Sequence, residues 1–239
     1  MQMVKSKDLD QNLTKIFYNI KLKGAKMSNK LKFSAMSVIY IQYSFDYVLK
    51  SYSELGIDAI EFWAAEPHYY SNRFETREES LDYLNRLKNK LDDSKIKVSM
   101  FTPETLMYPY SYSHPEKKVR ANTINYMKSA CEEASILGCN KVFVNTGCGL
   151  RDIPIIESWK NCVNSYKEIC DYAKTLNVNI VLEQLQPYES NLVTDLKSCM
   201  EMKKDVNRDN FKICLDLVAM EVANENIKDY FNVFGKDIV

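Results

Sequence analysis

The stretch Asn179-Ile180-Val181-Leu182-Glu183 is a short apolar segment that ends in a carboxylate. Further along the chain, Phe211-Lys212-Ile213-Cys214-Leu215-Asp216 has the same form. Short, almost continuous apolar segments are typical of strands that are buried in a parallel sheet. Because the carboxyl ends of such strands open onto one side of the sheet, we expect Glu183 and Asp216 to converge and to hold a divalent cation.

Apolar strand-like segments and amphipathic helical segments alternate from residue 31 onward. The expected strands are 31–36, 59–63, 97–101, 142–145, 179–183 and 211–216, and residues 236–239 are expected to begin a seventh. The expected helices are 45–55, 78–91, 115–137, 156–176, 195–206 and 224–234. This alternation predicts an α/β fold with a parallel sheet and right-handed crossovers.

Two parallel architectures compete for this pattern: a closed barrel and an open, doubly wound sheet. The doubly wound sheet usually has a glycine-rich phosphate turn after its first strand. Here that position is occupied by Ser37-Val38-Ile39-Tyr40, which contains no glycine. The sequence therefore favours a TIM (β/α)8 barrel, with about six βα units present and the last two missing.

Two regions are expected along the chain. Residues 1–30 form an N-terminal extension, in which Leu9, Leu13, Ile16 and Ile20 have the spacing of a short amphipathic helix. Residues 31–239 form the barrel domain, which we expect to be incomplete at its C-terminal end.

Composition excludes several classes of protein. The 239 residues include 32 Lys and Arg and 32 Asp and Glu, so the net charge of zero argues against nucleic acid or an anionic membrane as a partner. No apolar stretch approaches the length of a membrane span. The seven cysteines have neither a CxxC motif nor a zinc-site spacing, which is typical of reduced core residues in a cytoplasmic protein. The composition is compatible with a homo-oligomer as well as with a monomer.

Further side chains on the predicted loops are candidates for binding a substrate. Glu189 closes the turn after Glu183, and His68 lies in the loop after the second strand. Trp63 and Tyr108 are aromatic residues on the same predicted face, as are Tyr110 and Tyr188. Each has an ordinary alternative: a strand-end acid can cap a helix, a loop histidine is often idle, and aromatic residues can simply pack the rim. Glu61 lies within a strand and needs a hydrogen-bond partner if it is buried.

Four stretches together resemble a known family. They are Gly56-Ile-Asp-Ala-Ile-Glu-Phe-Trp63, Pro67-His68, Thr102-Pro-Glu-Thr105 with Tyr108-Pro-Tyr110, and Glu183-Gln-Leu-Gln-Pro-Tyr-Glu-Ser-Asn191. They are similar to the sugar phosphate isomerase/epimerase superfamily, whose members have the xylose isomerase-like TIM barrel. Within it the chain resembles the fructoselysine and ketose 3-epimerases, and the resemblance covers roughly residues 31–239.

The resemblance implies a site with four ligands to a divalent metal ion. Glu183 and Asp216 match the first two, and the family's histidine and second glutamate would follow Val239. Glu183 would also be catalytic. Glu189 matches a contact with a substrate hydroxyl, and His68 matches a loop position near the substrate.

The implied activity is epimerisation or isomerisation of a ketose, a sugar phosphate or a fructosamine. A proton is removed from the carbon next to the carbonyl group, and the metal ion stabilises the enediolate. One alternative is a catalytically inactive, truncated remnant of such an enzyme. A second is an endonuclease of abasic sites, but that class uses several more histidines than the two present here.

Overall fold

The computed structural model describes residues 32–106 and 109–239. The predicted N-terminal helix and Tyr108 therefore lie outside the described residues. Within them the strands are β1 (Ala35–Met36), β2 (Ala59–Ala64), β3 (Lys97–Pro103), β4 (Lys141–Val144), β5 (Asn179–Glu183) and β6 (Phe211–Cys214). The first six expected strands are thus present, although the first is shorter than expected and begins at Ala35.

The α-helices of the described chain are α2 (Phe45–Leu55), α3 (Arg77–Asp93), α4 (Lys117–Ile136), α5 (Ile155–Thr175), α6 (Leu196–Val206), α7 (Leu217–Val222) and α8 (Ile227–Phe234). Short 3-10 turns occupy Ser37–Tyr40, Ser71–Arg73 and Gly235–Asp237. Helix α7 was not predicted, because it begins directly after the strand, where Asp216 is its N-cap. The helix expected over 224–234 begins later, at Ile227.

Residues with special roles set the helix ends. Gly56 has φ of 70°, a left-handed conformation that ends α2 with little strain because glycine has no Cβ. Thr76 and Glu79 form a capping box that starts α3. Asp195 caps α6 by accepting a hydrogen bond from the backbone N–H of Ser198. Local side-chain and backbone features therefore fix these helix ends.

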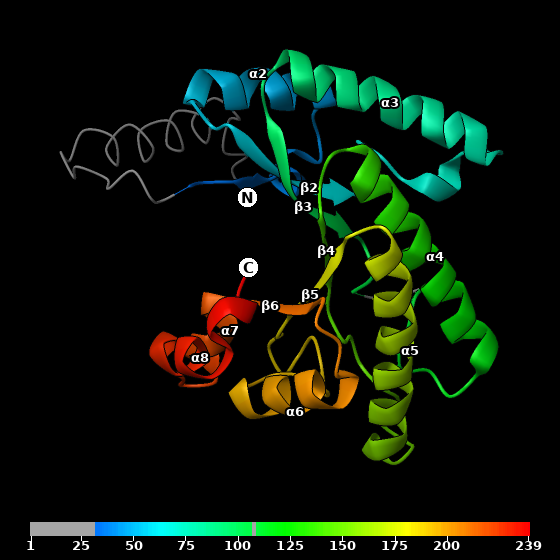
Figure 1. The fold of residues 1–239 in the computed structure, drawn as a ribbon, viewed down its shortest axis with the longest axis vertical. Helices are drawn as coiled ribbons and strands as arrows, with labels where there is room; N and C mark the ends of the chain where they lie inside the picture. The colour runs from blue at the N-terminus through cyan, green and yellow to red at the C-terminus, as the bar shows by residue number, and fades with distance from the viewer. Residues whose placement is uncertain (1–31, 107–108) are drawn as a thin grey trace, which may run out of the picture.

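The six strands form one parallel sheet in the order β1-β2-β3-β4-β5-β6. Because the order follows the sequence without a reversal, successive right-handed crossovers place the helices on one face, as in a barrel and unlike a doubly wound sheet. Figure 1 shows the helices from α2 to α8 in an arc around the strands.

The described part of the sheet is open, with β1 and β6 at its two ends. The expected seventh strand is present only as a bridge: Ile238 pairs in parallel with Ile213, and the backbone N–H of Val239 donates to the Ile213 carbonyl over 3.1 Å. No helix of the described chain combines the length and apolar character needed to cross a membrane.

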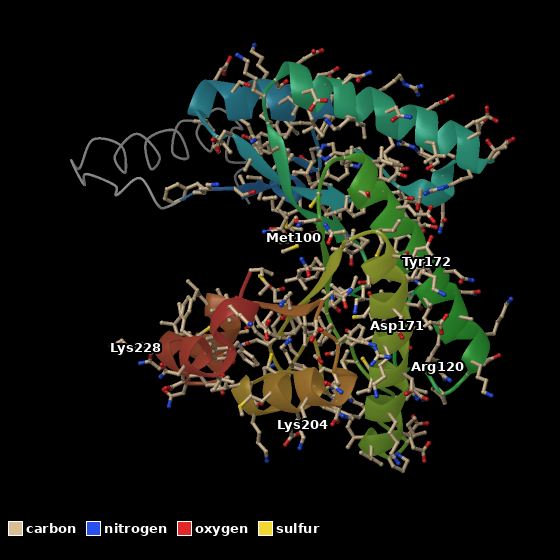
Figure 2. All side chains as sticks on the ribbon, viewed as in Figure 1. Met100, Arg120, Asp171, Tyr172, Lys204 and Lys228 are labelled. Atoms are coloured by element: carbon tan, nitrogen blue, oxygen red, sulfur yellow. The ribbon has the colours of Figure 1, made fainter. Side chains whose placement is uncertain are left out.

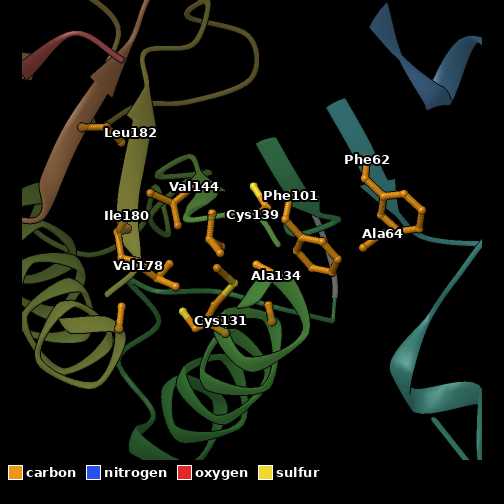
Figure 3. Packing of buried hydrophobic residues seen from close by; sticks show 14 of the residues in the cluster. Phe62, Ala64, Phe101, Cys131, Ala134, Cys139, Val144, Val178, Ile180 and Leu182 are labelled. Atoms are coloured by element: carbon orange, nitrogen blue, oxygen red, sulfur yellow. The ribbon is translucent and has the colours of Figure 1, made fainter. Parts of the chain in front are cut away.

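The strands alternate their side chains between two faces of the sheet. On the outer face, residues such as Ile180 and Leu182 pack against the helices, and the rings of Phe62 and Phe101 stack with centroids 5.7 Å apart. Figure 3 shows this layer. On the inner face, Met100, Phe143 and Val181 form a second, smaller cluster, against which Cys214 packs. Figure 2 places Met100 inside the arc, whereas Arg120, Asp171, Tyr172, Lys204 and Lys228 lie on the outer helices.

Candidate active site

Phe143 of the inner apolar cluster lines a cavity at the carboxyl ends of the strands. Because Glu183 follows Val181 by two residues in β5, the alternation places its side chain on the same inner face. The cavity has a volume of about 280 Å³. Acidic residues from several strands and loops line it: Glu61, Glu104, Glu183, Glu189 and Asp216.

Glu183 has the most perturbed environment of these acids. Burial, followed by the charges of Asp216, Glu61 and Glu189, raises the pKa of the Glu183 carboxyl to about 8. Among the described residues that line the cavity there is no Lys, Arg or His to offset this charge. The cavity is therefore suited to a cation.

Asp216 lies just beyond the end of β6 and is half-buried. One of its carboxylate oxygens accepts a hydrogen bond from the Val218 N–H over 2.7 Å, so it caps α7 as well as lining the cavity. The expected convergence of Glu183 and Asp216 in one cavity is therefore present. Within residues 32–106 and 109–239, no three His, Cys, Asp or Glu side chains are arranged to hold a metal ion.

Glu61 is an acid of this cavity that we did not predict as a site residue. It accepts a hydrogen bond from the Thr102 hydroxyl over 2.8 Å, rather than from a lysine or the backbone, and burial raises the pKa of its carboxyl. The alternation of side chains along β2 explains this position. Phe62 packs against the helices, so its neighbours Glu61 and Trp63 point to the opposite, inner face of the sheet.

Trp63 lines the cavity from β2, and two partners hold it. Its indole N–H donates to a carboxylate oxygen of Glu104 over 3.1 Å, and its backbone N–H donates to the Ser37 hydroxyl over 2.9 Å. The other oxygen of Glu104 accepts from the Leu106 N–H over 2.9 Å. Glu104 therefore joins the indole ring to the loop after β3.

Glu189 lies in the loop after β5, where its carboxylate accepts a hydrogen bond from the Gln186 N–H over 3.1 Å. Paired contacts join this loop to the one after β4. The hydroxyls of Thr146 and Ser190 bond over 2.9 Å, and the Asn191 side chain bonds both the N–H and the carbonyl of Gly149. Glu189 lines the acidic cavity and also a second cavity beside it.

His68 has a different environment from the one expected. It is buried rather than exposed, its Nε2 lies 3.0 Å from the Tyr43 carbonyl oxygen, and its ring packs against Phe45 with centroids 5.7 Å apart. It is not among the residues that line either cavity. Its contact with a substrate stays a prediction, as does that of Tyr108. Tyr110 and Tyr188 line the second cavity.

Comparison with known proteins identifies the family. Residues 49–239 match the sequence model of the protein family described as xylose isomerase-like TIM barrel. The chain belongs to this family. The sequence resemblance to the superfamily and the expected fold are thereby confirmed, with the described strands forming an open six-stranded sheet.

Several of the proteins to which this chain is similar are carbohydrate epimerases. The chain is 24% identical over 190 residues to fructoselysine 3-epimerase of Escherichia coli O157:H7, which covers 80% of this chain and 67% of the relative. It is also similar in fold to D-psicose 3-epimerase of Clostridium cellulolyticum H10, with a TM-score of 0.73 and 18% identity over 87% of this chain and 71% of that one. The IOLI protein, crystallised with a bound zinc atom, has a TM-score of 0.68 and 22% identity over 87% and 70% of the two chains.

Proposed function

We propose that this chain is a metal-dependent epimerase or isomerase that acts on the carbon next to the carbonyl group of a ketose or ketose derivative. The observation that carries the proposal is the position of Glu183, which is half-buried at the end of β5 and lines one cavity with Asp216 and further acids. A carboxylate at such a position can accept a proton from a substrate bound in the cavity.

The carboxylate oxygens of Glu183 and Asp216 are chemically suited to bind a divalent cation. Glu183 and Asp216 would offer oxygen ligands to the ion, and its positive charge would offset the repulsion that contributes to the raised pKa of Glu183. When bound, the ion would supply charge that polarises the sugar carbonyl and stabilises the negative charge left by proton removal.

Other residues of the chain would bind and orient the sugar. Glu189 would accept a hydrogen bond from a substrate hydroxyl at the junction of the two cavities. Trp63, held by Glu104, provides a rigid aromatic wall against which a sugar ring or chain can pack. Glu183 would take the proton from the carbon next to the carbonyl. Inversion further requires an acid on the opposite face of the substrate.

Proton exchange tests the proposal, because it needs Glu183 but not the second acid. The chain is incubated in D2O with Mn²⁺ or Mg²⁺ and a panel of ketoses, and deuterium incorporation next to the carbonyl is followed by NMR. We expect exchange that depends on the metal ion and falls by at least about 100-fold in Glu183→Gln. The matched control is Glu168→Gln, which makes the same change in a surface ion pair with Lys128.

Calorimetric measurement of metal binding distinguishes the proposed enzyme from an inactive remnant. Binding of the ion without any exchange would support an inactive remnant instead. Absence of both binding and exchange would contradict the proposed function.

A further inference from the structure

The second cavity adjoins the acidic one at the carboxyl ends of β3, β4 and β5. It has a volume of about 340 Å³, room for on the order of ten non-hydrogen atoms. The two cavities share Thr105, Leu106 and Glu189, so a molecule in the first can extend into the second. Nothing in the proposed proton transfer uses this second space.

The walls of the second cavity are held in place before any ligand arrives. The ring of Tyr110 stacks on Tyr126 with centroids 4.1 Å apart, and its hydroxyl accepts a hydrogen bond from the Asn72 amide over 2.8 Å. The buried Tyr112 donates to the Thr105 hydroxyl over 3.0 Å. A preformed aromatic wall lowers the entropy lost when a flexible group binds.

The residues that line the second cavity disfavour an anionic ligand. Apart from Gly147 and Glu189, the described lining residues have aromatic, aliphatic, hydroxyl or thiol side chains. Glu189 is the single charged residue among them. Neither cavity has a Lys, Arg or His among the described residues that line it. A phosphate or carboxylate placed here would lie near the Glu189 carboxylate without a basic partner, which is unfavourable.

We infer that the second cavity is a subsite for an arm attached to the sugar, and that this arm is uncharged or cationic rather than anionic. The inference rests on the proposed function, which places the sugar in the acidic cavity. It narrows the substrate class to ketose derivatives that carry an apolar or amine-bearing extension, and it excludes sugar phosphates whose phosphate would occupy this space.

The test is a binding series on the metal-loaded chain. Calorimetry compares a ketohexose with derivatives bearing a butyl, benzyl, aminobutyl or phosphate group at either end of the sugar. We expect a neutral or amine arm to raise affinity by about tenfold, because it buries apolar surface, and a phosphate to lower it below that of the parent sugar.

Two variants locate the effect in the cavity. Cys148→Trp fills the second cavity and is expected to abolish the gain from the arm while leaving affinity for the parent ketose unchanged. Leu150→Trp adds the same ring at an exposed position of the same loop that does not line the cavity, and it should retain the gain.

The outcomes separate this inference from the proposed function. Metal-dependent binding of the parent ketose with no gain from any arm, or tighter binding of the phosphate, would overturn the subsite and leave the proposed function intact. A gain from the arm that Cys148→Trp does not change would also overturn it. If proton exchange fails but the arm still gives a gain that Cys148→Trp removes, the subsite stands and the proposed chemistry falls.

Discussion

At the scale of single residues, the acidic cavity combines groups that repel one another. Glu183 is half-buried beside Asp216, Glu61 and Glu189, and in the described chain no basic side chain lines the space they share. Such an arrangement costs stability in the absence of a cation, since a buried carboxylate without a positive partner is unfavourable. Unfavourable groupings of charge that perturb pKa values are common at active sites.

The first prediction concerns the pH dependence of the metal-free protein. The pKa of Glu183 is about 8 in the folded state and about 4.5 in its ordinary state. Between these values the folded state binds more protons than the unfolded one, so the free energy of unfolding should fall as the pH rises from about 4.5 to about 8. The fall should be on the order of 3 kcal/mol, as measured by denaturant unfolding in EDTA.

Glu183→Gln should lose this pH dependence, because the amide does not titrate, and should unfold at higher denaturant concentration than the parent chain at pH 8. Glu168→Gln, an exposed change on α5, should behave like the parent. Parallel pH profiles for the parent chain and Glu183→Gln would contradict the environment that we describe for Glu183.

At the scale of elements, the loops after β4 and β5 act as one unit. The Asn191 amide holds both backbone groups of Gly149, and the Ser190 hydroxyl donates to the Gly147 carbonyl over 2.6 Å. Gly149 also lies tightly against α5: a Cβ added there would be 2.4 Å from the Cβ of Ser158. These contacts fix the loop that carries Glu189 relative to both cavities.

The second prediction tests that close approach. Gly149→Ala should lower the free energy of unfolding by about 1–3 kcal/mol, because the methyl group overlaps Ser158 in a packed region. Adding Ser158→Gly to this variant should recover part of the loss, and the double-mutant cycle measured by denaturant unfolding reports the coupling. Additive effects of the two substitutions would show that the overlap is relieved elsewhere.

At the scale of the whole molecule, the described sheet is open and apolar surface surrounds its β6 end. Leu217, Val218 and Phe231 of α7 and α8 are 61%, 60% and 53% exposed. Unpaired strand edges and exposed apolar patches both favour association between chains.

The third prediction is that the 239-residue chain associates with itself as its concentration rises. Sedimentation analysis should show a shift toward dimers or larger species, and Phe231→Lys should reduce it. Ile156→Lys removes a comparably exposed apolar side chain, at 52%, from α5 on another part of the surface and should have no such effect. A monomer at all concentrations would contradict the prediction.

The sequence by itself determined the parallel α/β fold, most element boundaries and the positions of Glu183 and Asp216 at the ends of two neighbouring strands. These features depend on local patterns: the period of two or 3.6, the caps at Gly56 and Thr76, and the position of an acid at a strand's end. Strand ends converge in any such barrel, so the pair follows from the fold class.

Only the tertiary structure decided the rest of the candidate site. The burial of His68, the hydrogen bond from Trp63 to Glu104 and the second cavity beside Glu189 each join segments that are far apart in the chain. Such contacts depend on how the sheet curves and how the loops after its strands pack together, and no short-range pattern encodes that geometry. The hydrophobic periodicity of the sequence determines the fold class. The packing of the loops after the strands determines the shape and charge of the candidate substrate cavity.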